Sequence, residues 1–243
     1  MPQDRFLEGK TALVTGASAG IGRATALRLA SLGAHVVLAA RRADRLESVA
    51  HEIEGLAGVR ALPVVTDVGR EDEVERLAAT AQREFGAVDV LVHSAGYGYF
   101  AKTTALDAGR LEALLRVNFL GAVLCAKHLV PGMLERRSGA VVLVNSVSGK
   151  RGWAEGTPYV ASKFALRGFA QCLWAEVHSH DVRVVSVYPD YVASDFYAVA
   201  GLKVAGLEKA IPPEDVAEAI AGALRLSGRS SVVELDVWPT NMA

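Results

Sequence analysis

The sequence has few cysteines, almost no net charge and no long uninterrupted run of apolar residues. Its two cysteines, Cys125 and Cys172, lie within apolar helical patterns, so we expect reduced core thiols, as in a cytoplasmic protein, rather than a disulfide. Lysine and arginine together number 26 and the acidic residues 27, which gives a net charge of −1. This balance provides no basic surface of the kind that binds nucleic acid or an anionic membrane.

Charged residues and histidines interrupt each apolar stretch well before the ~18 residues that a membrane-spanning helix requires, so we expect no such helix. Residues 1–10 carry charges of both signs and no apolar core, which does not fit a signal peptide. Because the chain also has no linker, low-complexity tract or repeat, we expect residues 1–243 to form a single domain.

Apolar runs typical of buried strands alternate along the chain with helical patterns. The predicted strands are 11–15, 34–40, 61–65, 88–92, 140–144, 182–187 and 232–237. The predicted helices are one that ends at residue 32, then 44–53, 71–85, 107–134 with Pro131 bending or ending it, about 156–175, and 214–226. Since parallel strands need crossover helices, this order predicts an α/β fold. We expect one doubly wound Rossmann-type domain, with a parallel seven-stranded sheet and helices on both faces.

In doubly wound sheets, ligands bind beyond the carboxyl ends of the strands. The residues that follow successive predicted strands include Gly16, Arg41, Asp67, Ser94, Ser146 and Pro189. The sequence therefore predicts one binding edge that gathers polar residues from most of the chain.

Three glycines, Gly16, Gly20 and Gly22, lie between the first predicted strand and the first helix. Glycines let the backbone approach a pyrophosphate closely, and a helix N-terminus favours its negative charge. The GxxxGxG spacing differs from the usual GxGxxG, and a purely structural turn is the alternative. Their position in the first βα unit favours a dinucleotide site.

Strand two is followed by Arg41 and Arg42, where an acidic residue would bind the hydroxyls of an adenosine ribose. An arginine suits a 2′-phosphate instead, which predicts NADP(H) rather than NAD. One of these arginines is alternatively a solvated residue at a helix start. Asp67 is either a helix cap or an adenine contact.

Tyr159 and Lys163 lie one turn apart on the same face of a predicted helix. A phenol has an ordinary pKa of about 10, and a nearby ammonium group favours its ionised form. A tyrosine tuned in this way suits proton exchange with an alcohol or ketone oxygen. Taken alone, the pair also fits an ordinary exposed helix pair, so the interpretation depends on the other motifs.

Over essentially the whole chain, these motifs resemble the short-chain dehydrogenase/reductase family, and they follow the family's order. The matching segments are the cofactor loop at 15–22 (TGASAGIG, with Ser18 and Ile21), the adenine contact Asp67-Val68, the Ser94-Ala95-Gly96 element, the active-site residue Asn118, and Ser146, Tyr159 and Lys163. Ala40-Arg41 resembles the NADP-preferring members.

The resemblance implies that Ser146 holds the substrate oxygen and that Tyr159 exchanges a proton with it. It also implies that Lys163 lowers the pKa of Tyr159 and binds the nicotinamide ribose, and that Asn118 holds a water of a proton relay. A helix-interior residue satisfied by the backbone is the alternative for Asn118, and a turn-forming serine is the alternative for Ser146. The resemblance also places Pro189, Val192 and Ser194 at the cofactor.

Two positions depart from the family's pattern. Ser94 replaces an asparagine, so we expect a more weakly braced loop. Asp190 replaces a glycine after strand six and brings a charge near the reacting groups, which narrows the pocket or favours a polar substrate. His93 has no partner at metal-ligand spacing, so we expect a strand-end histidine with satisfied hydrogen bonds and no metal site.

Eight residues of three predicted loops are candidate substrate walls: Tyr97, Tyr99, Phe100, Trp153, Glu155, Tyr191, Phe196 and Tyr197. They suit a mid-sized, partly apolar carbonyl compound, although core or interface positions are the alternative. The substrate segment, about 190–213, is short for a lid, so we expect a rather open site. The resemblance implies a homo-oligomer, a dimer or a homotetramer.

The leading hypothesis is an NADP(H)-dependent carbonyl reductase, or alcohol dehydrogenase in reverse, acting on a small molecule. The second is a redox sensor that binds NADP(H) without turnover, a reading that only Asp190 favours. The third is an epimerase or dehydratase, which usually needs an added substrate domain for which this chain has little room.

Overall fold

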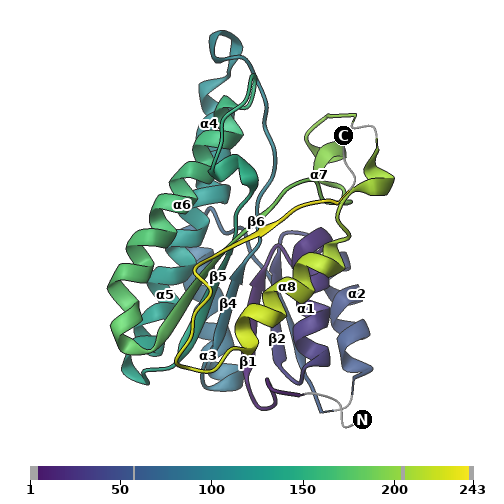
Figure 1. The fold of residues 1–243 in the computed structure, drawn as a ribbon. Helices are drawn as coiled ribbons and strands as arrows, with labels where there is room; N and C mark the ends of the chain where they lie inside the picture. The colour runs from purple at the N-terminus through teal and green to yellow at the C-terminus, as the bar shows by residue number, and fades with distance from the viewer. Residues whose placement is uncertain (1–4, 57, 204–205, 241–243) are drawn as a thin grey trace.

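The structure is a computed structural model that describes residues 5–56, 58–203 and 206–240. Seven parallel strands form one sheet in the order β3-β2-β1-β4-β5-β6-β7 (Figure 1). The strands are β1 (Thr11–Thr15), β2 (His35–Ala40), β3 (Ala61–Val65), β4 (Val90–His93), β5 (Gly139–Val144), β6 (Val182–Pro189) and β7 (Glu234–Val237). This confirms the predicted α/β fold with a parallel seven-stranded sheet.

Helices cover both faces of the sheet, so its central strands are buried on both sides (Figure 1). The helices are α1 (Gly20–Ser31), α2 (Ala43–Glu54), α3 (Glu71–Phe85), α4 (Ala108–Leu115), α5 (Gly121–Glu135), α6 (Thr157–Val177), the short α7 (Phe196–Val199) and α8 (Pro213–Arg225). One apolar core lies under α1, α2 and α8, and a second lies under α3, α5 and α6. The predicted core thiol Cys125 belongs to the second core, but Cys172 is exposed, so the core position predicted for Cys172 is wrong.

The predicted helix 107–134 has an internal irregularity that the sequence pattern does not reveal. A π-helical segment, Arg116–Leu120, joins α4 to α5. Pro131 lies inside α5, which continues to Glu135, so the prediction that this proline ends the helix is wrong. One inserted residue in a helical ladder changes the direction of the side chains that follow, and such segments often occur at functional sites.

The stretch Ala108–Glu135 is long and apolar enough to cross a membrane by length and composition alone, which a buried core helix can also be. Its buried residues include Leu124, Cys125 and Met133, which pack in the core under α5. Its packing in the core therefore accounts for the apolar composition of this stretch. The prediction about a signal peptide falls partly on residues 1–4, which lie outside the described residues.

The order of the strands reverses between β1 and β4, which are direct neighbours with Thr15 opposite His93. The connections after β1 and β4 leave toward opposite faces, and a crevice opens between them at the carboxyl edge of the sheet. The binding edge expected from the sequence lies at this switch point.

Candidate active site

A cavity of about 870 Å³ opens at the carboxyl edge of the sheet. Its lining includes sixteen of the seventeen predicted cofactor residues: Gly16, Ser18, Gly20, Ile21, Arg41, Arg42, Asp67, Val68, Ser94, Ala95, Gly96, Tyr159, Lys163, Pro189, Val192 and Ser194. The catalytic candidates Ser146, Tyr159 and Lys163 also line it. Gly22 and Asn118 do not, and both act from behind the cavity wall.

The glycine loop folds tightly against the end of β4. Gly16 has a positive φ of 68°, and a Cβ built on it would lie 2.8 Å from the backbone nitrogen of Ala95. A Cβ on Gly22 would lie only 2.3 Å from the carbonyl oxygen of Gly16. Both contacts exclude any side chain, so these glycines let the loop and the start of α1 pack close together.

Thr15 braces the loop after β4. Its hydroxyl accepts hydrogen bonds from the backbone N–H groups of Ser94 and Ala95, both at 3.2 Å, and shares a 3.1 Å hydrogen bond with Nδ1 of His93. We expected this loop to be weakly braced at Ser94, and the hydrogen bonds of Thr15 brace it instead. This bracing by Thr15 could not be predicted from a local sequence pattern.

His93 fulfils the expectation from the sequence in part, because its Nδ1 shares the hydrogen bond with Thr15. Its Nε2 is buried without a hydrogen-bond partner in the part of the chain that the structure describes. Burial, and then the nearby charge of Lys163, lower the pKa of His93 to about 3, so the ring is neutral. Among the described residues, no group of histidine, cysteine and acidic side chains could hold a metal ion.

The two arginines after β2 have different surroundings. Arg42 donates a 2.9 Å hydrogen bond to the hydroxyl of Ser18 and so ties the start of α2 to the glycine loop. Arg41 is exposed and lines the cavity beside Asp67. Asp67 accepts from the N–H of Gly69 at 3.0 Å and does not cap α3, so the helix-cap alternative is wrong.

Ser146 and Tyr159 meet inside the cavity. Ser146 Oγ accepts a 3.1 Å hydrogen bond from the N–H of Ser148, and this bond forms the turn that our alternative for Ser146 predicted. Burial raises the pKa of Tyr159 above its ordinary value, and a hydrogen bond from Ser146 opposes this rise. The polypeptide alone therefore does not lower the pKa of Tyr159 as the resemblance implied.

Lys163 lies behind Tyr159. Its Nζ donates a 3.0 Å hydrogen bond to the carbonyl of Val144 and lies 5.7 Å from the centre of the Tyr159 ring. Burial lowers the pKa of Lys163 to about 8. The ammonium is thus held by a strand end at a fixed place beside the phenol.

Asn118 lies in the π-helical segment and is completely buried. Its Oδ1 accepts from the N–H of Tyr97 at 3.0 Å, and its Nδ2 donates to the Tyr97 carbonyl at 2.9 Å and to Ser162 Oγ at 3.1 Å. This confirms the alternative of an asparagine satisfied largely by backbone. A Cβ on Gly96 would lie 3.2 Å from Asn118 Oδ1 and 4.0 Å from Lys163 Nζ, so both side chains approach the same glycine.

Aromatic rings cover the catalytic tyrosine. The rings of Phe100 and Phe196 each lie 5.4 Å from that of Tyr159, whose residue is only 8% exposed. Phe196, in the short segment after β6, therefore covers the phenol, while the rather open site stays a prediction. Of the eight candidate wall residues, Tyr99 and Glu155 do not line the cavity. The hydroxyl of Tyr99 instead accepts a hydrogen bond from the N–H of Asp107.

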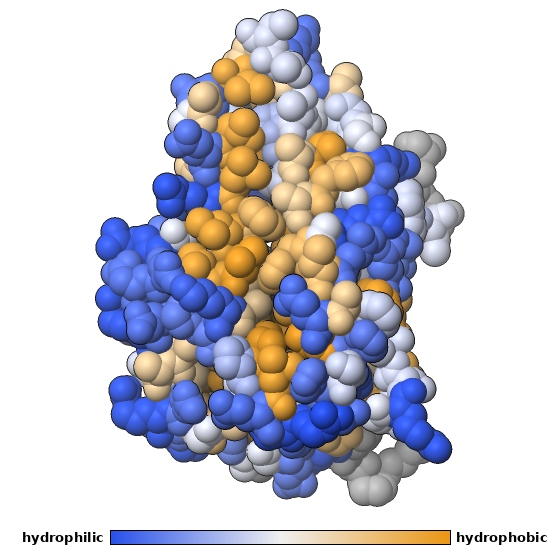
Figure 2. All heavy atoms as spheres, turned by 90° about the vertical axis from the view of Figure 1, so that its left-hand side faces the viewer, coloured by the Kyte–Doolittle hydropathy of each residue, from blue (hydrophilic) through white to orange (hydrophobic). Residues whose placement is uncertain are grey.

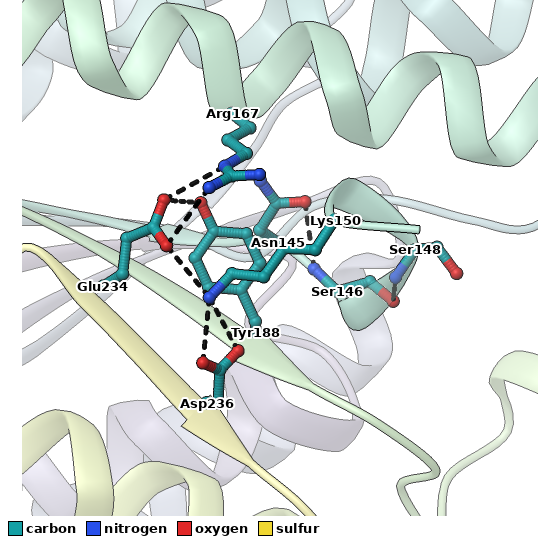
Figure 3. A network of polar contacts seen from close by, with 8 residues as sticks. All are labelled: Asn145, Ser146, Ser148, Lys150, Arg167, Tyr188, Glu234 and Asp236. Atoms are coloured by element: carbon teal, nitrogen blue, oxygen red, sulfur yellow. Dashed lines mark hydrogen bonds and ion pairs between the residues drawn. The ribbon is translucent and has the colours of Figure 1, made fainter. Parts of the chain in front are cut away.

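The turn that carries Ser146 is tied to the last strand by a polar network (Figure 3). Lys150, directly after the turn Val147–Gly149, pairs with Glu234 at 2.9 Å and with Asp236 at 2.8 Å. Its ammonium also lies 4.0 Å from the centre of the Tyr188 ring. Sequence reasoning missed this arrangement, because β7 and the turn lie far apart in the chain.

We expect Lys150→Met to lower kcat/KM for the best substrate about tenfold while cofactor affinity changes little. The substitution removes the ion pairs with Glu234 and Asp236, so the turn that carries Ser146 shifts. Displacement of a reacting group by about 1 Å can lower the rate up to 100-fold. Lys150→Arg should recover most of the activity. Lys127→Met removes an exposed lysine that pairs with Glu71, and it should leave steady-state kinetics unchanged. Equal kinetics in Lys150→Met and Lys127→Met would show that the network has no positioning role.

Comparison with known proteins identifies the family. The sequence model described as short chain dehydrogenase matches residues 10–203. The chain belongs to the short-chain dehydrogenase/reductase family. The match includes the glycine loop, Ser146, Tyr159 and Lys163, so it confirms the resemblance stated above.

Two curated relatives illustrate the range of this family. Glycine betaine reductase ATRR of Emericella nidulans is 37% identical over 240 residues, which is 96% of this chain but only 19% of that protein. An uncharacterized oxidoreductase of Staphylococcus aureus is 35% identical over 233 residues, covering 96% of this chain and 98% of the relative.

Two solved structures share the fold over almost their whole length. An alcohol dehydrogenase from the archaeon Thermococcus sibiricus, complexed with 5-hydroxy-NADP, has a TM-score of 0.89 at 31% identity and covers 96% of this chain and 98% of its own. A metagenomic short-chain oxidoreductase in complex with NADP has a TM-score of 0.85 at 33% identity, with 97% and 99% covered.

Proposed function

We propose that this protein is an NADP(H)-dependent oxidoreductase that interconverts a carbonyl compound and its alcohol, which is a secondary alcohol where the carbonyl compound is a ketone. The observation that carries the proposal is the convergence of Ser146, Tyr159 and Lys163 on the cavity that the glycine loop also lines. A phenol, a hydroxyl and an ammonium at one point suit proton exchange with a carbonyl oxygen.

The cavity fits a phosphorylated dinucleotide by the chemistry of its lining. Gly16 and Gly22 leave no room for side chains where a pyrophosphate would approach the start of α1. Arg41 and Arg42 provide cations for a 2′-phosphate at the end of β2. Two similar structures are complexes with 5-hydroxy-NADP and NADP, which supports the same choice here. NADP(H), when bound, supplies or accepts the hydride.

Each catalytic side chain has one task in the proposed reaction. Ser146 receives a hydrogen bond from the N–H of Ser148 and directs its own proton toward Tyr159, where it would hold the substrate oxygen. Tyr159 donates its proton to that oxygen during ketone reduction and takes it back during alcohol oxidation. Lys163 stabilises the ionised phenol by its charge and binds the nicotinamide ribose. Asn118 has its amide group engaged by Tyr97 and Ser162, so its task is to keep the carbonyl of Tyr97 oriented.

The proposal is tested by following NADPH oxidation over a panel of ketones, aldehydes and diketones, with NADH run in parallel. We expect turnover of at least one carbonyl compound, with NADPH preferred. Consumption of NADPH must match the alcohol formed, mole for mole. Binding of NADPH without turnover of any compound would instead support the sensor hypothesis, which the acidic Asp190 at the cavity wall favours.

Arg41→Ala should weaken NADPH binding about 10- to 150-fold and leave NADH binding almost unchanged. This range corresponds to the loss of one charge-assisted hydrogen bond, about 1.5–3 kcal/mol. Fluorescence titration of both cofactors measures the difference. Arg45→Ala is the control, because Arg45 pairs with Asp195 and does not line the cavity. Equal weakening of NADPH and NADH by Arg41→Ala would reject the phosphate contact.

The outer face of α6 supports the proposal of a homo-oligomer, a dimer or a tetramer. Apolar side chains gather on the side of the molecule that α4, α5 and α6 form (Figure 2). The exposed positions of α6 include Ala161, Phe164, Gly168, Cys172 and Ala175, which recur at helical spacing. Phe164 is 44% exposed. A second copy of the chain would cover this stripe.

The protein's proposed location is the cytoplasm. The free thiols of Cys125 and Cys172 agree with this location.

A further inference from the structure

Asp190 places a carboxylate in the cavity wall with little to neutralise it. Its side chain is only 13% exposed, and it directly follows β6. Its ion pair with Arg151 is long, at 4.0 Å between Oδ2 and Nη2, compared with about 2.7–2.9 Å for a hydrogen-bonded pair. Burial raises the pKa of Asp190, and Arg151 opposes this rise only in part. The carboxylate can therefore accept a closer cation than it has.

Arg151 is held on the outer side of this pair. Its side chain is 60% exposed, and its guanidinium lies 4.8 Å from the centre of the Trp238 ring. Water screens such an exposed charge, so Arg151 compensates the more deeply buried Asp190 only weakly.

Aromatic rings line the same cavity as Asp190. Tyr191 stacks on Tyr197 at 5.8 Å, Tyr197 meets Phe196 at 5.4 Å, and Phe196 meets Phe100 at 6.4 Å. Burial raises the pKa of Tyr197 to about 12, and the nearby charge of Asp190 adds a little to this rise. Faces of aromatic rings attract cations, most strongly when water is excluded. Through Tyr197 and Phe196 the ring cluster reaches Tyr159, whose ring lies 5.4 Å from that of Phe196.

The other charged residues of the cavity wall have different settings. Three of them follow strands β2 and β3, in the half of the sheet that does not contain β6: Arg41, Arg42 and Asp67. Lys163 is buried behind Tyr159. Asp195 pairs with Arg45 at 3.3 Å and is 66% exposed. Among the described lining residues, Asp190 is thus the weakly compensated anion beside the catalytic group.

We propose that Asp190 and the neighbouring aromatic rings bind a positively charged nitrogen, so that the preferred substrate is a short aldehyde or ketone bearing an ammonium group. The inference rests on the proposed carbonyl reduction and names its substrate class. A carboxylate pairs with the cation, and the rings enclose its alkyl groups. Asp190 and Tyr159 line the same cavity, so one small molecule can present its nitrogen to the carboxylate and its carbonyl to the phenol.

An anionic substrate fits this site poorly. Its carboxylate would have to reach Arg151 past the buried carboxylate of Asp190, and two like charges at such a distance repel. Neutral ketones meet no such repulsion, but they leave the desolvated carboxylate without a new partner. The charge of the substrate is therefore the property that this site distinguishes.

The test uses two aldehydes of the same shape, trimethylammonioacetaldehyde and 3,3-dimethylbutanal, which differ in one atom and one charge. Succinic semialdehyde provides an anionic comparison. NADPH oxidation gives kcat/KM for each compound with the wild-type protein and with Asp190→Asn, Asp190→Gly and Asp195→Asn. The decisive quantity is the change in the cation-to-neutral ratio between proteins, because the intrinsic reactivity of the two aldehydes cancels in that comparison.

We expect the ratio to fall at least tenfold in Asp190→Asn and Asp190→Gly and to stay constant in Asp195→Asn, which removes a paired and exposed carboxylate from the same cavity. NADPH affinity and the melting temperature should not change. Reduction of both aldehydes with the same ratio in all proteins would overturn the inference and leave the proposed function standing. So would a preference for succinic semialdehyde.

Absence of any turnover would instead count against the proposed function. Calorimetric titration of the NADP⁺-loaded protein with the two corresponding alcohols then decides the cation site. Tighter binding of the charged alcohol that disappears in Asp190→Asn supports the site, and equal binding of both alcohols overturns it.

Discussion

Tyr159→Phe is expected to lower kcat for carbonyl reduction about 100- to 10,000-fold, the range typical of a lost general acid. The change removes one oxygen atom from a side chain whose ring stays packed between Phe100 and Phe196. Shape and apolar contacts therefore persist, and only the proton donor is lost. Steady-state kinetics with the best substrate of the panel measures the effect.

Two controls separate chemistry from folding in this variant. NADPH affinity should remain within about twofold. The melting temperature should not fall, because Ser146 is the one side chain of the described residues that hydrogen-bonds to the buried phenol. Tyr197→Phe removes a neighbouring hydroxyl from the same aromatic cluster and should reduce kcat far less. Unchanged turnover in Tyr159→Phe would exclude this residue as the proton donor.

Gly22→Ala is expected to reduce NADPH affinity at least tenfold and to lower the free energy of unfolding by about 1–3 kcal/mol, the usual range for an overpacked site. A Cβ at this position would lie 2.3 Å from the carbonyl oxygen of Gly16 and 2.7 Å from its carbonyl carbon. Both atoms are backbone, so the loop itself must move. The loop then no longer presents its N–H groups to a pyrophosphate.

Gly222→Ala is the matched control, because it makes the same change inside α8, where a Cβ would meet nothing within 4 Å. This substitution should stabilise the helix slightly, since alanine favours helices over glycine by about 1 kcal/mol. Urea unfolding and cofactor titration of both variants test the prediction. Wild-type cofactor affinity in Gly22→Ala would show that the loop adapts to the methyl group.

The sequence predicted elements well wherever a local pattern determined them. The spans predicted for β1, β3 and α3 agree with the structure, because an apolar run or a helical period marks each one. The predicted strand 88–92 is displaced relative to β4, and the predicted strand 232–237 is shorter in β7. The π-helical segment at Asn118 escaped prediction, because one extra residue in a helical turn leaves no signature in composition.

The candidate site divides in the same way. Gly16, Ser146, Tyr159 and Lys163 could be named from spacing and resemblance, and the structure brings them to one cavity. Thr15 as the brace of the β4 loop and Lys150 as the partner of β7 could not be named. Their partners lie on other strands, and hydrogen bonds between distant segments produce no local pattern.

The sequence by itself determined the fold class, the chemical type of the catalytic groups and their order along the chain, since these follow from periodicity and residue identity. Only the tertiary structure decided the environment of each group. It buried Tyr159 under Phe196, left Nε2 of His93 without a partner in the described residues, and placed Asp190 against a solvent-exposed arginine. Burial and charge compensation depend on residues that are remote in sequence, and these two quantities determine protonation and substrate preference.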